Sequence, residues 1–324
     1  MSSAMRIFRS LEEARPVFGP SALSIGNFDG VHAGHRRILR RVREVAGENG
    51  WKPSVLTFDP HPTTVVAPDR SPRLMTTPEQ RCRLMEQEGI AQVLILPFTR
   101  EVAQLLPEQF VRELLVEALG ARAVLVGGNF RFGHKQGGDT RMLRDLGTEL
   151  GFSVEVVPPI TVRRVLVSSS EIRRLVESGD VSRACRLLER PFALEGDVVH
   201  GHGVGAKQTV PTLNLSTRAE TRPANGVYIT RTRDLSSGNS WESVTNIGYR
   251  PTFGGTDLAI ETFLLSRLEG EAPRRIRVEF LRRLRDEKKF DSPERLKAQI
   301  LQDVARAQAY FRRVPCHNQE TERP

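Results

Sequence analysis

Ten residues, Gly26 to His35 (GNFDGVHAGH), bring together side chains that could bind phosphate. His32 and His35 flank a glycine, directly after a short apolar run and directly before a basic, helix-like stretch. Both imidazoles are therefore expected at a strand-to-helix turn, where the unpaired N–H groups and the dipole of the helix favour anions. Gly30 and Gly34 would let the backbone turn sharply and approach a ligand closely. The candidate phosphate-binding residues are Gly26, Asn27, Phe28, Asp29, Gly30, His32, Gly34 and His35.

The elements that would position this segment alternate along the first half of the chain. The expected strands are 23–25, 54–58, 93–96, 123–126 and 154–157, and the expected helices are 36–48, 78–88, 107–119 and 140–150. Pro78 and Pro107 suit the first turn of a helix, and Gly151 suits the position just past a helix end. The alternation predicts an α/β fold with a parallel sheet covered on both faces, whose ligands bind beyond the carboxyl ends of the strands.

Two more polar segments follow expected strands. One is TFDPHP at residues 57–62, and the other is GGNFRFGH at residues 127–134. Each segment alone could be a turn with an incidental polar residue. Brought to one sheet edge, they would add imidazole, arginine and amide groups and a flat aromatic surface. Such a set suits a nucleotide and a ring.

A further segment, SSSEIR at residues 168–173, permits two interpretations. Ser168 with Glu171 three residues later is an ordinary capping box for a helix over 172–177. The same N–H groups and hydroxyls could also hold a phosphate, and the sequence leaves both interpretations open. The candidates for phosphate contact are Ser168, Ser169, Ser170 and Arg173.

Near residue 190 the pattern changes from alternation to strand after strand. The expected strands are 192–199, 227–231, 243–247, 259–265 and 275–281, followed by one helix over 293–311. Consecutive strands without intervening helices predict a small antiparallel barrel. We expect a first domain over 1–187, a second over 188–312 and a polar tail over 313–324.

The second half has its own polar cluster. Residues 201–206 (GHGVGA) match a dinucleotide fingerprint formally, but Pro211 follows and no helix pattern begins there, so a glycine-rich loop fits better. Thr212 and Asn214 alternate along an extended segment and share one face, where a hydroxyl and an amide oxygen could bind Mg²⁺. Glu261 stands alone in an apolar run and could either face solvent or do chemistry.

Bulk composition limits what these sites can belong to. The 324 residues are 39% hydrophobic and 27% charged, as in an ordinary soluble globular protein. No apolar run approaches the roughly 18 residues of a membrane span, and the start lacks a signal-peptide core, so we expect no membrane partner and a cytoplasmic location. The net charge is +9, but six of the 48 basic residues are lysine, which indicates compositional bias rather than a nucleic-acid surface. Cys82, Cys185 and Cys316 are scattered and are expected to be reduced thiols.

Seven segments carry a family resemblance: GNFDGVHAGH, TFDPHP, GGNFRFG, SSSEIR, PTLN, NIGYRPTF and RVEFLRRLRDEKKF, in this order. Together they resemble the bacterial bifunctional riboflavin kinase/FMN adenylyltransferases, often called FAD synthetases. The resemblance implies a Rossmann-like adenylyltransferase domain followed by a six-stranded riboflavin kinase barrel. The implied reactions convert riboflavin to FMN and FMN to FAD, with ATP as co-substrate and Mg²⁺ as cofactor.

The resemblance also implies roles for individual residues. His32 and His35 would bind and stabilise ATP phosphates, Thr212 and Asn214 would hold magnesium, and Glu261 would be the general base of the kinase. Gly203, Gly205 and Lys207 would contact nucleotide phosphates in the barrel half. Asn129 is implied in the ATP site and is also a candidate for flavin contact. The flavin-binding candidates are Phe58, Pro60, His61, Pro62, Asn129, Phe130, Arg131, Phe132 and Arg285.

The two reactions have different chemical needs. The phosphate of FMN is already an anion near neutral pH, because the second pKa of a phosphate monoester is about 6, so adenylylation requires no general base. The ribityl hydroxyl of riboflavin is poorly acidic, and Glu261 is the best candidate to accept its proton. Members of the family usually read GRxxGFPTAN where this chain has Ala206, Thr209 and Val210 in place of the arginine, the glycine and the phenylalanine. Two alternatives therefore remain: an adenylyltransferase with a degenerate barrel, or a flavin-responsive binding protein without turnover.

Overall fold

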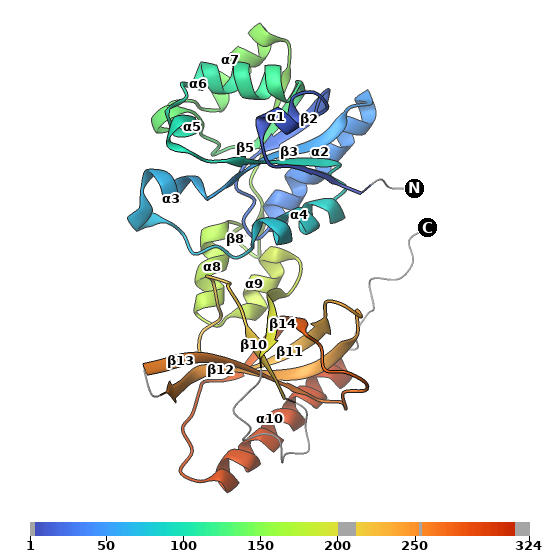
Figure 1. Ribbon diagram of the computed structural model, residues 1–324, viewed down its shortest axis with the longest axis vertical. Coiled ribbons are helices and arrows are strands. Elements are labelled where there is room, and N and C mark those ends of the chain that lie inside the picture. The colour runs from blue at the N-terminus through green and yellow to red at the C-terminus, as the bar shows by residue number, and fades with distance from the viewer. Residues whose placement is uncertain (1–3, 200–211, 253–254, 315–324) are drawn as a thin grey trace. The chain divides into compact units, whose positions relative to one another are not determined.

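The computed structural model describes residues 4–199, 212–252 and 255–314, without the side chains of residues 250–252 and 255–257 (Figure 1). Contacts between Cα atoms divide the chain into two compact units, Met1–Glu171 and Ile172–Pro324. The first unit contains the expected parallel sheet and the second contains the expected barrel, so the predicted fold class is confirmed. The domain boundary near residue 188 stays a prediction.

A six-stranded parallel sheet in the order β1-β4-β3-β2-β5-β6 forms the centre of the first unit. Its strands are β1 (Arg6–Phe8), β2 (Ser21–Ile25), β3 (Lys52–Asp59), β4 (Gln92–Pro97), β5 (Ala121–Gly127) and β6 (Ser153–Val157). From β2 the sheet grows through β3 and β4 on one side, and then through β5 and β6 on the other. The order in which strands are added therefore changes direction between β2 and β5, although the strands stay parallel. Ligands of such sheets bind beyond the carboxyl ends of the strands at this point.

Helices cover both faces of this sheet. The helical elements are α1 (Leu11–Ala14), α2 (Ala33–Asn49), α3 (Pro62–Val66), η1 (Pro68–Arg70), α4 (Pro78–Gln87), α5 (Arg100–Gln104), α6 (Pro107–Gln109), the π-helical η2 (Phe110–Ala118), η3 (His134–Gln136) and α7 (Thr140–Leu150). A short hairpin of β7 (Thr161–Val162) and β8 (Val165–Leu166) follows β6. In β4, Leu94 and Leu96 pack with α1, η2 and α7, whereas Val93 and Ile95 pack with α2 and α4. This alternation of the strand side chains produces two separate cores, one on each face.

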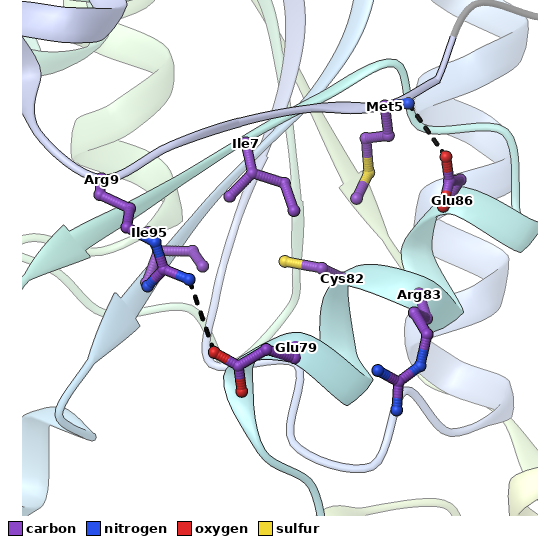
Figure 2. A pocket seen from close by; sticks show the side chains of 8 residues that line it. All are labelled: Met5, Ile7, Arg9, Glu79, Cys82, Arg83, Glu86 and Ile95. Atoms are coloured by element: carbon purple, nitrogen blue, oxygen red, sulfur yellow. Dashed lines mark hydrogen bonds and ion pairs between the residues drawn. The ribbon is translucent and has the colours of Figure 1, made fainter. Parts of the chain in front are cut away.

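The edge strand β1, which the sequence pattern did not reveal, is fastened to α4 by polar contacts (Figure 2). The backbone N–H of Met5 donates to Glu86 Oε1 (3.0 Å), and Arg9 Nη2 lies 3.5 Å from Glu79 Oε1. A small pocket of about 170 Å³ lies among these residues, and Cys82 lines it. Burial raises the pKa of the Cys82 thiol, and likewise that of Cys185, which favours the protonated form of both thiols. Cys316 lies outside the described residues.

A closed antiparallel barrel in the order β10-β13-β12-β11-β14-β9 forms the centre of the second unit. Its strands are β9 (Phe192–Val199), β10 (Thr212–Ser216), β11 (Gly226–Asp234), β12 (Ser240–Thr252), β13 (Gly255–Leu264) and β14 (Arg275–Arg285). Helix α8 (Ser169–Glu177) runs into this unit, α9 (Val181–Leu188) precedes the barrel, and α10 (Pro293–Arg313) follows it. Among the described residues, no helix combines the length and apolar character needed to cross a membrane.

The two faces of the barrel strands differ in what covers them. Val227, Ile229 and Val244 pack against Ala307 and Phe311 of α10, so these positions lie on the outside of the barrel. The alternate positions point inward. There, fully buried hydroxyls bond to one another over distances of 2.7 to 2.9 Å, in a chain made by Thr230, Thr232, Ser243, Thr245 and Thr262.

Candidate active sites

The loop between β2 and α2 holds a tightly turned backbone. Phe28, Gly30 and Val31 all have positive φ angles, of 50°, 77° and 35°. Asp29 is 2% exposed, and its carboxylate accepts from the backbone N–H groups of Met75 (3.0 Å) and Thr76 (3.1 Å). The loop is therefore fixed by its own contacts, and the carboxylate of Asp29 is used to hold the segment before α4. Contact of Asp29 with phosphate stays a prediction.

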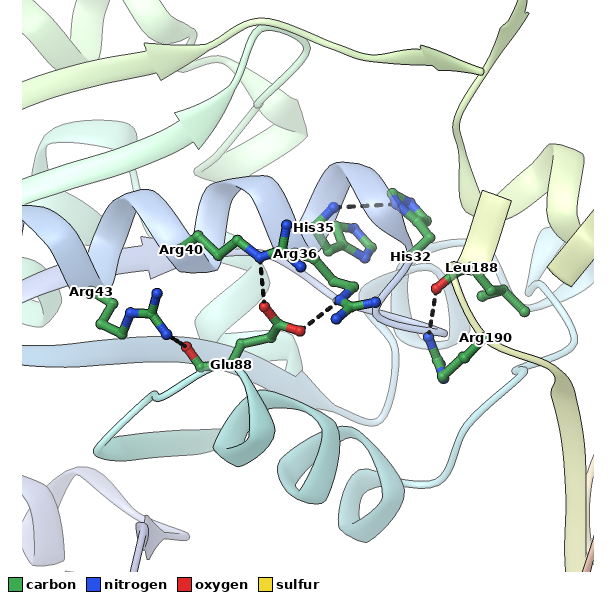
Figure 3. Close-up of polar contacts among 8 residues, drawn as sticks. All are labelled: His32, His35, Arg36, Arg40, Arg43, Glu88, Leu188 and Arg190. Atoms are coloured by element: carbon green, nitrogen blue, oxygen red, sulfur yellow. Dashed lines mark hydrogen bonds and ion pairs between the residues drawn. The ribbon is translucent and has the colours of Figure 1, made fainter. Parts of the chain in front are cut away.

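The two histidines stand together at the start of α2 (Figure 3). His32 caps the helix, because its Nδ1 accepts from the backbone N–H of His35 (3.3 Å). The two rings are stacked, with centroids 3.6 Å apart and an angle of 13° between their planes. Since Nδ1 of His32 is an acceptor, the proton of the neutral ring lies on Nε2, which can donate to a phosphate oxygen.

The two glycines of this segment have different roles. Gly30 takes the left-handed conformation that the predicted sharp turn requires. Gly34 is helical instead, and a Cβ at this position would come within 3.2 Å of the His32 ring. The absent side chain of Gly34 therefore leaves room for an imidazole rather than for a closer backbone approach to a ligand.

Arginines of α2 converge on one buried carboxylate beside the histidines (Figure 3). Arg36 Nε and Arg40 Nε lie 2.6 and 3.0 Å from the carboxylate oxygens of Glu88, and Arg43 donates to the Glu88 carbonyl (3.4 Å). The side chain of Glu88 is 8% exposed. Arg36 and Arg40 thus share one acidic partner within the fold. The expectation that the arginines form no nucleic-acid surface stays a prediction.

The TFDPHP segment divides between the core and the site. Phe58 is buried in the core, where its ring packs edge-on against Phe98 with centroids 5.4 Å apart. His61 caps α3 through Nδ1, which accepts from the N–H of Thr63 (3.2 Å), and its Nε2 lies 2.8 Å from the side-chain amide of Asn27. His61 is therefore tied to the β2–α2 loop. Pro60 follows a cis peptide bond and is exposed, and Pro62 is the first residue of α3.

The loop after β5 exposes part of its predicted set. Asn129 and Arg131 are exposed, and Arg131 pairs with Asp139 over 3.3 Å. Phe132 is buried, bridges to Gly138 through its backbone and stacks on Phe130 with ring centroids 5.5 Å apart. Phe130 is partly buried, so it is the better placed of the two rings to contact a flavin.

The serine segment forms the expected helix cap, and its contact with phosphate stays a prediction. Ser168 Oγ accepts from the N–H of Glu171 (3.2 Å), as a helix cap does. Ser169 Oγ donates to the carbonyl oxygen of Asp29 (3.0 Å), which joins this segment to the β2–α2 loop. Ser170 is exposed, and Arg173 lies on α8 within the second unit. The loops after β2 and β5 follow the two neighbouring strands at which the strand order changes direction, the place where ligands of such sheets bind. That the predicted residues gather there around a ligand stays a prediction.

In the barrel, strand register aligns polar residues that are distant in sequence. Asn214 on β10 pairs with Glu261 on β13, and Glu261 pairs on its other side with Asn246 on β12. Directly opposite residues of antiparallel strands point to the same face with Cβ atoms about 4.5–5.5 Å apart. Thr212 lies two residues before Asn214 and shares this face, which is the outer one. All four side chains are partly buried.

This row has the donor chemistry for a hard cation. Hydroxyl, amide and carboxylate oxygens are ligands that Mg²⁺ accepts. Within the described ranges, no group of three or more His, Cys, Asp or Glu side chains is arranged to hold a metal, so a cation here would depend on Thr212 and Asn214. Gly203, Gly205 and Lys207 lie outside the described residues.

Arg285 on β14 lies in the same cross-strand row as Asn246, because Val227 on β11 pairs with both residues. Its Nη2 lies 2.9 Å from Asp303 Oδ2 on α10, and the two side chains are 13% and 3% exposed. This buried pair anchors α10 to the barrel. Contact of Arg285 with flavin stays a prediction beside that structural role.

Comparison with known proteins agrees with both halves of this geometry. A FAD synthetase family model matches residues 15–171, and a riboflavin kinase family model matches residues 188–311. The bifunctional riboflavin kinase/FMN adenylyltransferase of Pseudomonas fluorescens is 37% identical, over 94% of this chain and 97% of the relative. That of Escherichia coli K12 is 34% identical, over 89% and 92%. The chain belongs to the bifunctional riboflavin kinase/FMN adenylyltransferase family.

A solved structure extends the likeness of this riboflavin kinase/FMN adenylyltransferase to the whole architecture. The structure, described as a macrolide-efflux protein from Streptococcus pneumoniae, is 26% identical with a TM-score of 0.83. The match covers 94% of this chain and 99% of that one. The order of an α/β unit and a barrel is therefore shared along nearly the full length.

Two residues that were not among the predicted site residues lie beside them in the structure. Asn246 belongs to the segment NIGYRPTF, but its position beside Glu261 depends on strand register, which the sequence does not state. Arg81 belongs to no motif. It lies on α4, is 2% exposed and donates to the backbone of Asn27 in the β2–α2 loop (2.7 Å).

Proposed function

We propose that the enzyme performs its two reactions at two separate places. Riboflavin would be phosphorylated to FMN at the outer face of the barrel, beside Glu261. FMN would be adenylylated to FAD at the β2–α2 loop, beside His32. One observation carries this division: the barrel offers Glu261 between two amide side chains, whereas the carboxylate of the loop, Asp29, is occupied by backbone amides.

Adenylyl transfer needs alignment and charge stabilisation more than proton transfer. The FMN phosphate oxygen attacks the α-phosphorus of ATP, the bond from that phosphorus to the bridging oxygen breaks, and pyrophosphate leaves. Negative charge grows on the leaving group and on the α-phosphate oxygens. His32 Nε2 and the first N–H groups of α2 are donors fixed in place before reaction, which is the arrangement that stabilises such charge.

Phosphorylation of riboflavin needs a base. Glu261 would accept the proton of the ribityl hydroxyl. The hydroxyl oxygen of riboflavin then attacks the γ-phosphorus of ATP, and ADP leaves. Thr212 and Asn214 would hold Mg²⁺, which when bound neutralises part of the phosphate charge. Asn246 would hold the carboxylate of Glu261 from the strand on its other side.

A product assay tests the proposed function. Purified protein incubated with riboflavin, ATP and magnesium should form FMN first and FAD later, as followed by liquid chromatography. Addition of a chelator in excess over magnesium should stop both steps. FAD formation from FMN without FMN formation from riboflavin would instead support a degenerate barrel. Flavin binding without consumption of ATP would support a binding protein.

A further inference from the structure

Arg81 is a charged residue buried beneath the β2–α2 loop. Its Nη1 donates to the carbonyl oxygen of Asn27 (2.7 Å) and lies 3.5 Å from Thr57 Oγ1. Thr57 Oγ1 itself donates to the same carbonyl (3.3 Å). One edge of the guanidinium therefore joins three elements: the loop after β2, the end of β3 and helix α4.

The other two nitrogens of this guanidinium have no hydrogen-bond acceptor among the described residues. Nε and Nη2 of Arg81 are buried and have no hydrogen-bond partner among the described residues, where Arg81 also makes no salt bridge. Burial lowers the pKa of Arg81, and the carboxylates of Asp29 and Asp59 oppose that effect from a distance. Folded proteins usually pair a buried arginine, because an unmet charged donor is costly. The fold nevertheless keeps this positive charge under the loop.

The contacts of Arg81 connect its positive charge to the β2–α2 loop. The carbonyl that Arg81 holds belongs to Asn27, whose side-chain amide lies 2.8 Å from His61 Nε2. The same loop continues through Asp29 to the histidine cap of α2. A cation fixed below this loop adds to the positive potential of the helix N-terminus above it. The substrates expected there, ATP and FMN, are both anions.

We propose that Arg81 is a positioning residue of the adenylyltransferase site, which holds Asn27 and Thr57 in place and whose charge is balanced when phosphate groups occupy the loop. This inference rests on the assignment of FMN adenylylation to the β2–α2 loop. Arg81 acts through the loop backbone and does not contact substrate.

The test compares Arg81→Met and Arg81→Lys with Arg83→Met in the full-length enzyme. Arg83 is exposed on the same helix and provides a matched control. Arg81→Met should lower kcat for FAD formation from FMN, and raise KM for ATP in that reaction, each by about tenfold or more, because small displacements of bound groups are costly. Arg81→Lys keeps the charge without the planar fork, so it should recover KM but not kcat. FMN formation from riboflavin should change less than about twofold in all three variants, since that reaction belongs to the barrel.

A binding measurement separates this inference from the proposed function. Inorganic pyrophosphate, titrated calorimetrically into the enzyme, should bind about tenfold more weakly to Arg81→Met than to Arg83→Met, even if the wild type made no FAD. Should Arg81→Met not fold, Thr57→Val replaces it. That variant retains the charge and should lower kcat for FAD formation without changing KM for ATP. Unchanged kinetics and pyrophosphate affinity in Arg81→Met, or equal losses in Arg81→Met and Arg81→Lys, would overturn the inference.

Discussion

At the scale of single residues, Glu261 shows how register decides between two interpretations. In the sequence it is one glutamate within an apolar strand. Such a residue is as often a solvent-facing side chain as a catalytic or binding one. In the barrel it is partly buried, with Asn214 opposite on one side and Asn246 on the other. Register therefore places a carboxylate between two amide side chains, which could restrict its orientation as a general base requires.

Replacement of Glu261 by glutamine tests the proposed base. The substitution preserves shape and removes the group that accepts the proton, so kcat for riboflavin phosphorylation should fall about 10²- to 10⁴-fold. KM for riboflavin should stay within a few-fold of the wild-type value, and FAD formation from FMN should be unaffected. Steady-state kinetics of each half-reaction provide the measurement. Glu242→Gln, the same substitution on the adjacent strand β12, is the control. A rise in KM with no loss of kcat would assign Glu261 to binding.

Residue types and spacing could predict His32 and His35 but not Arg81. The histidines are rare in this chain and lie at a recognisable strand-to-helix junction. Arginine is abundant and appears on every expected helix, so nothing distinguishes Arg81 from exposed neighbours such as Arg83 in sequence. Its burial follows from the way α4 packs below two loops, which is a tertiary property.

At the scale of elements, helices whose ends carry strong signals were predicted best. The helix expected over 140–150 has those ends, because Asp139 caps it through the N–H of Met142 (2.9 Å) and Gly151 takes the left-handed conformation. Helix α9 was missed. It is only eight residues long and is held by contacts with the barrel, such as Ser182 Oγ to the Leu281 carbonyl (3.0 Å). Strand β10 was recognised only as extended, since its pairing with β13 depends on distant residues.

Two glycines of helix α2, Gly34 and Gly47, allow effects on helix stability to be distinguished from effects on adenylyltransferase activity. Alanine stabilises a helix relative to glycine by roughly 0.5–1 kcal/mol. At Gly47 a new Cβ meets no atom within 4 Å, whereas at Gly34 it lies 3.2 Å from the His32 ring. Gly47→Ala should therefore raise the free energy of unfolding by about that amount and leave both activities unchanged.

Gly34→Ala should behave differently, because the added methyl group must displace the imidazole that caps the helix. We expect FAD formation to fall about tenfold or more, while the gain in stability from alanine in a helix is offset by the loss of the cap. Thermal unfolding curves and FMN adenylylation rates of the two variants provide the comparison. If Gly34→Ala kept full adenylyltransferase activity, the position of the His32 ring would be irrelevant to the reaction.

At the scale of the whole molecule, the residues that carry the two proposed sites, the β2–α2 loop and the row of Glu261, lie in separate compact units. The contacts that join His61, Arg81 and Ser169 to the β2–α2 loop all lie within Met1–Glu171. The row of Asn214, Glu261 and Asn246 lies within Ile172–Pro324. Each unit also has its own core. Free FMN is the product of one site and the substrate of the other, so the two reactions should be separable by mutation.

Complementation between two variants tests this separation. His32→Asn keeps a side-chain oxygen that can cap α2 but removes the imidazole, so it should form FMN from riboflavin and almost no FAD. Glu261→Gln should form FAD from added FMN and almost no FMN from riboflavin. An equimolar mixture should convert riboflavin to FAD after a lag, because FMN must first accumulate in solution. Time courses of both flavins show the lag directly. A mixture that accumulates FMN without FAD, although each variant performs its own half-reaction, would contradict exchange of free FMN between sites.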